Sequence, residues 1–176
     1  MKIDKLFDGL KQIANGDYVL EGNLVSDETI EIDLDDRLVI KGTIKSGRNI
    51  VARCSIEAGW GIEAGWGIES GGGIEAGGGI KAGGGIEAGL GIEAGWGIES
   101  GGGIKAGCGI KAGLGIEASD GIEAKTFINA SKRIFAGISI YRTSKDCNKT
   151  IRCAELRSGE ICYGDLILTK EANNEN

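Results

Sequence analysis

An aliphatic residue returns at every sixth position from Ile32 to Ile140 without a missed step. The stretch IEAGWGIEAGWGIESGGG, residues 56–73, is typical of the repeat. A disordered glycine-rich linker has no physical reason to keep such a register. Because six is an even number, this spacing holds the aliphatic residues on one side of a strand but carries them around a helix. The sequence therefore predicts strands.

The irregular ends of the array indicate which side chains face inward. Two positions after each aliphatic residue the chain carries only apolar or small side chains, such as Ser46 and Ala58. Four positions after it the chain accepts Asp36, Arg48 and Lys132, which a core excludes. We therefore expect the aliphatic residue and the small residue to be buried. The triplet that follows, usually Gly-x-Gly, is expected to form an exposed corner in which glycine allows positive φ or close backbone approach.

A strand of three residues buries too little surface by itself, so consecutive hexads must stack. Three hexads in each turn give a triangular coil of 18 residues, and the array then makes about six coils. Two hexads in each turn would give a flatter and taller rod, and charge pairing along the stack does not distinguish the two. We favour the triangular form because isoleucine and alanine fill a small prism well. The expected fold is an all-β, single-chain β-solenoid, and the absence of proline agrees with an uninterrupted ladder.

Both ends of the array are expected to be covered. Residues 1–16 carry apolar side chains at helical spacing, which predicts an amphipathic helix that covers the first coil or binds a partner. The solenoid is expected over residues 17–140, a cap over 141–169 and a solvated tail over 170–176. The cap is expected to contain two strands, within 151–156 and 161–168, joined by a turn at 157–160. Because an uncovered end exposes unpaired strand edges, covered ends favour a monomer or homodimer over an endless filament. The apolar residues of the predicted helix are Ile3, Leu6, Phe7, Leu10 and Ile13.

Composition excludes several classes of function. The chain has 176 residues and a net charge of −6, which argues against direct binding to nucleic acid or to an anionic membrane. It contains no histidine, and no nucleophile stands near an apparent base, so we expect no enzyme activity. The first residues form no apolar leader, and no segment approaches the run of about 20 apolar residues that spans a bilayer. These features predict a cytoplasmic protein.

The cysteines do not predict a disulfide framework or a metal site. The five cysteines are an odd number without a Cys-x-x-Cys pair, which suits a reducing compartment. Cys147, Cys153 and Cys162 are the best candidates for zinc ligands, but their spacing is irregular and a fourth ligand is missing. The repeat glycines are not followed by Gly-Lys-Ser/Thr, so they form no phosphate-binding loop. We expect no cofactor and no metal.

Charge and aromatic residues predict where a partner binds. Residues 56–124 hold ten acidic residues and three lysines, net −7, whereas residues 125–170 hold nine basic and four acidic residues, net +5. On the triangular model residues 18 apart stack, so three glutamates form a column that is expected to be the least compensated by lysine. A solvated face that keeps the rod soluble is the alternative explanation for this column. The glutamates are Glu57, Glu75 and Glu93, and Lys111 ends the column.

An apolar corner column is expected beside these glutamates. It contains Trp60, Gly78, Trp96 and Leu114, and Trp66 lies on the next corner. Exposed tryptophan is enriched at binding hot spots, so these side chains are expected to mark a contact. The alternative is that the cap or a second copy of the chain buries the rings. The predicted partner-binding set is Trp60, Trp66, Trp96, Leu114, Glu57, Glu75 and Glu93.

Three kinds of protein resemble parts of this chain. Hexads such as Ile56-Glu57-Ala58 resemble those of left-handed hexapeptide acyltransferases, but the order of aliphatic and small residue is reversed and the catalytic histidine is missing. GNLVSDETIEIDLDDRLVIKGTIKSGRNI, residues 22–50, is similar to bactofilins, which are cytoskeletal proteins that polymerise end to end. The IKAG and IEAG hexads resemble uncharacterised bacteriophage repeat proteins, as do RIFAGISIYR (133–142) and GEICYGDLIL (159–168). That last resemblance implies no established activity.

Taken with the charge, these patterns predict a non-enzymatic β-solenoid that binds a protein with a basic surface. The expected setting is a phage or mobile-element inhibitor of a nucleic-acid-handling host defence protein, such as a CRISPR effector. A bactofilin-like self-assembling structural protein is the alternative. A third class is an enzyme that uses Asp or Glu in a groove between the repeat body and the basic end.

Overall fold

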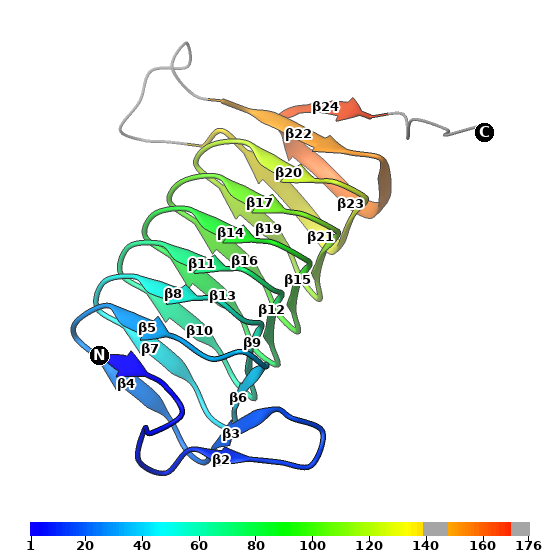
Figure 1. Cartoon of the computed structure of the whole chain (residues 1–176). Coiled ribbons are helices and arrows are strands. Elements are labelled where there is room, and N and C mark those ends of the chain that lie inside the picture. The colour runs from blue at the N-terminus through cyan, green and yellow to red at the C-terminus, as the bar shows by residue number, and fades with distance from the viewer. Residues whose placement is uncertain (139–147, 170–176) are drawn as a thin grey trace.

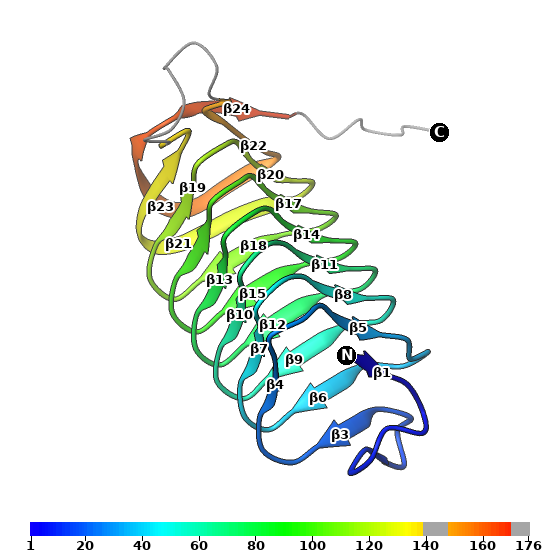
Figure 2. The same cartoon turned by 90° about the vertical axis from the view of Figure 1, so that its left-hand side faces the viewer.

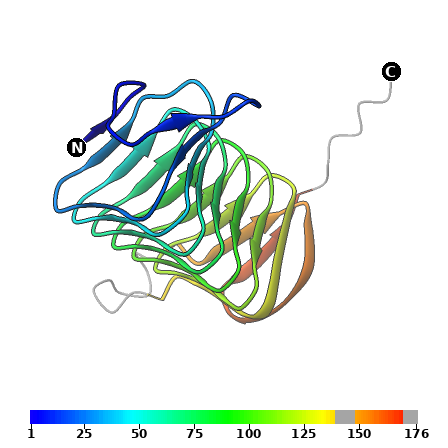
Figure 3. The same cartoon turned by 90° about the horizontal axis from the view of Figure 1, so that it is seen from below.

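The computed structural model describes residues 1–138 and 148–169, and over these residues the chain is a β-solenoid without helix. Each turn contains three short strands joined by tight corners, and successive turns pair in parallel (Figure 1). In the body the paired residues are 18 apart, as in Ile62 with Ile80, which confirms three hexads in each turn. The solenoid makes about eight turns and not about six, because residues on both sides of the hexad array add coils. Figures 2 and 3 show the stacked turns from the side and from below.

The strands form three faces, named here in the order in which the chain visits them. The first face contains β3 (Tyr18–Leu20), β6 (Leu38–Ile40), β9 (Ile56–Ala58), β12 (Ile74–Ala76), β15 (Ile92–Ala94), β18 (Ile110–Ala112) and the first part of β21 (Phe127–Ala136). The second face contains β4 (Leu24–Ser26), β7 (Ile44–Ser46), β10 (Ile62–Ala64), β13 (Ile80–Ala82), β16 (Ile98–Ser100), β19 (Ile116–Ala118) and the last part of β21. The third face contains β1 (Lys2–Ile3), β5 (Ile30–Ile32), β8 (Ile50–Ala52), β11 (Ile68–Ser70), β14 (Ile86–Ala88), β17 (Ile104–Ala106), β20 (Ile122–Ala124), β22 (Thr150–Cys153) and β24 (Asp165–Leu168). Two further strands, β2 (Lys11–Gln12) and β23 (Glu155–Tyr163), lie at the two ends.

The interior contains the residues that the repeat predicts. Ile56 and Ala58 are each 1% exposed, and the same two positions are buried in almost every coil. Each buried isoleucine contributes about 1.5–3 kcal/mol of transfer free energy, so the column of isoleucines is the main stabilising element. Where serine replaces alanine, its hydroxyl is satisfied. Ser100 donates to the carbonyl oxygen of Gly84 at 2.8 Å and accepts the N–H of Gly102 at 3.3 Å.

The predicted register is wrong in the first coil. Its third-face strand, β5, begins at Ile30, two residues before the predicted start at Ile32. Ile30 pairs with Ile50, and Ile32 pairs with Ala52, so Ile32 occupies the position of the small residue. The connection from β5 to β6 is therefore two residues longer than in the repeat, and Leu34 is buried within it at 1% exposure. A shift by two residues leaves the same side chains inside, and for this reason the sequence pattern did not reveal it.

The corner glycines of the central coils are needed for close backbone approach and not for positive φ. No residue between Gly22 and Gly137 has a positive φ. A Cβ on Gly95, the first glycine of its corner, would lie 2.1 Å from the carbonyl oxygen of Gly77 in the preceding coil. A Cβ on Gly97, the last glycine of the same corner, would lie 3.4 Å from its nearest neighbour. The first glycine is thus the sterically demanding one.

The amino-terminal helix predicted over residues 1–16 is not present. Instead β1 pairs in parallel with β5, and β2 pairs antiparallel with β3. Gly9 and Gly16 adopt positive φ values of 77° and 96°, which interrupt the run. Ile3 is fully buried, whereas Leu6 is 93% exposed. Strand pairing prevails because the edges of β3 and β5 offer unpaired N–H and C=O groups that a helix lying across them would leave unsatisfied.

The carboxyl-terminal segment is all β, as expected, and its strands extend the sheets of the solenoid. β22 pairs with β20, β24 pairs with β22, and β23 pairs along β21 with register shifts. The expected turn at 157–160 lies inside β23, where Gly159 has a φ of 118° and its backbone approaches Ile134. The expected boundary at Ile140 and the expected tail, 170–176, lie outside the described residues.

Candidate protein-binding surface

All three tryptophans lie on the outside of the solenoid, as the repeat predicts. Trp60, Trp66 and Trp96 are 65%, 57% and 60% exposed. Trp60, Trp96 and Leu114 occupy the first corner, which joins the first face to the second. Gly78 lies between the two tryptophans, donating its N–H to Trp60 and accepting that of Trp96. Because stacked strands lie about 4.8 Å apart, Trp60 and Trp96 are separated by about 10 Å along the axis.

Trp66 does not join this column. It lies on the second corner, which joins the second face to the third, so the whole width of the second face separates it from Trp60. The guanidinium of Arg48 lies 5.6 Å from the Trp66 ring centroid, a cation–π distance. Arg48 also forms an ion pair with Glu28 at 3.0 Å. The Trp66 ring is therefore already in contact with Arg48 of the same chain. Trp60 and Trp96 make no such ring contact within the described residues.

The three predicted glutamates do stack in one column of the first face. Glu75 pairs in register with Glu57 on one side and with Glu93 on the other. The expectation that this column is the least compensated is wrong. Arg37 lies 2.9 Å from Glu57, and Lys111 lies 2.5 Å from Glu93, whose carboxylate raises the pKa of the Lys111 amine through a hydrogen bond. Among these three, only Glu75 has no ion pair in the described part of the chain.

The third face is the least compensated instead. Within the described residues, Glu69 and Glu123 on that face and Glu117 on the second face have no ion pair. Sequence reasoning missed the role of Arg37 because residues 18 apart were paired, whereas Arg37 stands directly before β6 and its long side chain reaches Glu57, 20 positions further along the chain. The acidic charge is thus distributed over all three faces, and the tryptophans single out one corner.

A shallow groove runs along the second face beside the first corner. Its volume is about 810 Å³, and Trp96 and Leu114 form one wall. Its floor follows the last glycines of successive corners, including Gly79 and Gly97, which have no side chains to fill it. Phe135 closes its carboxyl-terminal end. The glycine track is visible in the sequence, but its position on a face follows only from the coil geometry.

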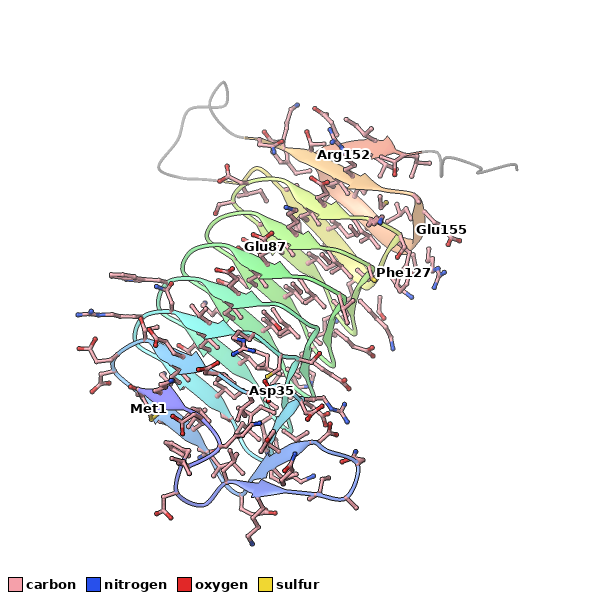
Figure 4. All side chains as sticks on the ribbon, in the orientation of Figure 1. Met1, Asp35, Glu87, Phe127, Arg152 and Glu155 are labelled. Carbon is pink, nitrogen blue, oxygen red and sulfur yellow. The ribbon has the colours of Figure 1, made fainter. Side chains whose placement is uncertain are left out.

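The third face carries a second hollow of about 920 Å³ with a more polar lining. Glu87, which Figure 4 labels on this face, forms an ion pair there with Lys105 at 3.2 Å.

At the carboxyl-terminal end, where Figure 4 places Phe127 and Glu155, Arg157 lies 3.9 Å from the Phe127 ring centroid.

The described residues contain no cluster of three or more possible metal ligands. Burial raises the pKa of the Cys54 and Cys153 thiols, so both are protonated at neutral pH and behave as core side chains. Cys108 and Cys162 are exposed. Cys147, the third candidate zinc ligand, lies outside the described residues.

Comparison with known proteins adds no family. No protein-family model matches the chain, no curated protein matches it, and no solved structure matches it. Within the described residues no helix is long and apolar enough to cross a membrane. The findings support a repeat-based β-solenoid, and the similarities to bactofilins and phage repeat proteins remain resemblances of sequence alone.

Proposed function

We propose that this protein is a non-enzymatic binding protein that docks a basic partner protein on its first corner and on the adjoining groove of the second face. The observation that carries the proposal is the pair of exposed indoles, Trp60 and Trp96, which no ring or cation within the described chain engages. Large exposed apolar side chains on one line are unfavourable in water and are enriched at protein interfaces. Leu114, 41% exposed, extends the same line by one coil.

Two carboxylates beside the corner can receive basic side chains of a partner, while Lys132 and Arg133 line the carboxyl-terminal part of the same groove. Glu75 on the first face and Glu117 on the second face lie on either side of the corner column, and neither has an ion pair within the described residues. An arginine of the partner can stack on an indole and approach one of these carboxylates at the same time. The contact between Arg48 and Trp66 is an example of such stacking within this chain. At an exposed site it contributes about 0.5–1 kcal/mol, and more once the partner excludes water.

The biological setting that we propose is inhibition of a nucleic-acid-handling host defence protein, such as a CRISPR effector, by a phage or mobile-element protein in the host cytoplasm. The support is a rigid body, residues 56–124, with a net charge of −7, which can compete with nucleic acid for a basic surface. The sequence resemblance to phage repeat proteins agrees with this setting. The alternative is a bactofilin-like polymer, for which the strands β1 and β2 over the amino-terminal end are unfavourable.

The test is a pull-down from bacterial lysate, followed by mass spectrometry and by binding measurements with the purified partner at increasing salt. We expect Trp60→Ala combined with Trp96→Ala to abolish capture of a basic protein and to leave circular dichroism unchanged. Trp66→Ala is the matched control, because it removes an indole of similar exposure from another corner, and it should retain binding. Full binding by the double variant would overturn the proposal.

A further inference from the structure

We propose that the carboxyl-terminal end of the solenoid is a homodimer interface, at which two copies of this chain pair their β24 strands about a two-fold axis. This contact is separate from the first corner, so it stands whether or not that corner binds a partner. It rests on the backbone, side chains and charge of residues 148–169 and on the contrast between the two ends.

The backbone of β24 has an unpaired edge. β24 is the last strand of the nine-stranded sheet, and within the described residues it pairs only with β22. Asp165 and Thr169 donate their N–H groups to Lys149 and Cys153 at 2.9 and 2.8 Å. Since alternate residues of a strand direct their hydrogen-bonding groups to opposite sides, Leu166 and Leu168 direct theirs to the open side. Unpaired groups on an apolar strand are a template for pairing with another chain.

The side chains of β24 show that the hydrophobic interior is open at this end. Leu166 stacks over Ile151 and Leu168 stacks over Cys153, so both leucines hold interior positions. Ile151 and Cys153 are fully buried, but Leu166 is 39% exposed and Leu168 is 57% exposed. Figure 1 shows no described strand beyond β24. This end therefore combines an unpaired backbone with uncovered core side chains.

A second copy fits this edge. In an antiparallel pair centred on Ile167, Leu166 lies opposite Leu168 of the other copy, and each such pair exchanges two backbone hydrogen bonds. Two identical edges related by a two-fold axis are self-complementary in this register. Charge does not oppose the contact, because residues 148–169 carry three basic and three acidic side chains, net 0. These are Lys149, Arg152 and Arg157 against Glu155, Glu160 and Asp165.

The amino-terminal end explains why the contact closes at two copies. A head-to-tail contact would repeat and give a filament only if β24 could pair with the first coil of the next molecule. β1 and β2 already cover two of the three strands of that coil, and Leu24 of the third strand is only 3% exposed. The two-fold contact uses only the carboxyl-terminal end. The strands β1 and β2, which end their sheets on the other side, are two residues long each and offer only a short edge to a further copy.

The mass of the full chain in solution tests the proposal. We expect sedimentation equilibrium to show a monomer–dimer equilibrium over the micromolar range. Leu168→Asp should weaken the dimer at least tenfold, because it places a charge in the contact, while the thermal unfolding of the dilute protein changes little. Leu6→Asp is the matched control at the other end, where the leucine is 93% exposed, and it should leave the dimer intact.

Three results would overturn the proposal: a full-length chain that is monomeric throughout, a chain that forms larger polymers, or a dimer that survives Leu168→Asp. A chain that ends at Thr169 tests whether residues 170–176, and not a second copy, cover the edge of β24. If the full chain is monomeric and the shortened chain dimerises, residues 170–176 cover the edge and the second copy does not.

Discussion

The two ends of this solenoid treat their terminal coils differently. At the amino-terminal end the interior residues of the first coil are closed off, with Tyr18, Leu20 and Leu24 at 4%, 8% and 3% exposure. At the carboxyl-terminal end the corresponding interior positions, Leu166 and Leu168, are 39% and 57% exposed. The hexad repeat determines how the three faces pack together in the interior. It does not determine how the first and last coils are covered. Each end is decided by whatever segment pairs with the last open strand edge.

The largest expected effect comes from substituting one interior residue at each end. Ile3→Ala should cost about 2–5 kcal/mol, because Ile3 is fully buried and its loss leaves a cavity under β1. Leu168→Ala should change the stability of the dilute protein by about 0.5 kcal/mol or less, because more than half of that side chain is in water. Urea denaturation at low protein concentration measures both. Equal losses would mean that both ends are equally closed.

The next largest expected effect on stability comes from the corner glycines of the central coils, which lie between the two ends. Gly95→Ala should cost about 1–3 kcal/mol, because its Cβ would lie 2.1 Å from the carbonyl oxygen of Gly77 and the coils must separate. Gly97→Ala, in the same corner, should be neutral or slightly stabilising, since its Cβ has 3.4 Å of clearance and alanine restricts the unfolded chain. Thermal melts of the two variants separate these outcomes. A larger loss for Gly97→Ala would contradict close approach as the reason for the first glycine.

The smallest expected effect is an acid sensitivity of the amino-terminal end. Hydrogen bonds from Lys2 and Arg53 hold the pKa of Asp33 below its ordinary value of 3.8, and Lys5 lowers that of Asp35. A lowered folded pKa contributes stability that is complete above the unfolded value and is lost as the pH falls through the folded value. We therefore expect the protection of the β1 amides against exchange, relative to the intrinsic rate at each pH, to fall below about pH 4 before that of the central coils does.

Asp33→Asn is the control for this acid sensitivity. It removes one titrating group at the same place, so the acid-induced opening of β1 should become shallower. An unchanged pH profile in this variant would show that the carboxylate does not contribute to closing the end.

The sequence predicted the regular part of the molecule well and its irregular parts poorly. Ile56 and Ala58 were assigned to the interior correctly because the even period and the corner charges leave one solution. The helix over residues 1–16 was wrong because helical spacing is a local signal, while the edges of β3 and β5 are formed by residues distant in the chain. A helical pattern also cannot show that Gly9 adopts a positive φ.

The candidate site was predicted in part for the same reason. The spacing of 18 residues was enough to place Trp60 and Trp96 on one corner and to stack Glu57 on Glu75. It could not show that Arg37 compensates Glu57, because the two residues are 20 apart and meet only through the length of the arginine side chain. The open edge of β24 was missed because two apolar strands at the end of a chain have the same pattern whether they close a core or leave it open.

Residue-resolved hydrogen exchange, measured at several protein concentrations, tests most directly the claim that one end is closed and the other is open. At the lowest concentration we expect the paired amides of the first coil to be as protected as those of the body, and the amides of Leu166 and Leu168 to exchange rapidly. Raising the concentration should protect those two amides and leave the first coil unchanged. Strong protection of Leu166 and Leu168 at every concentration, or a first coil that exchanges as fast as β24, would contradict the account.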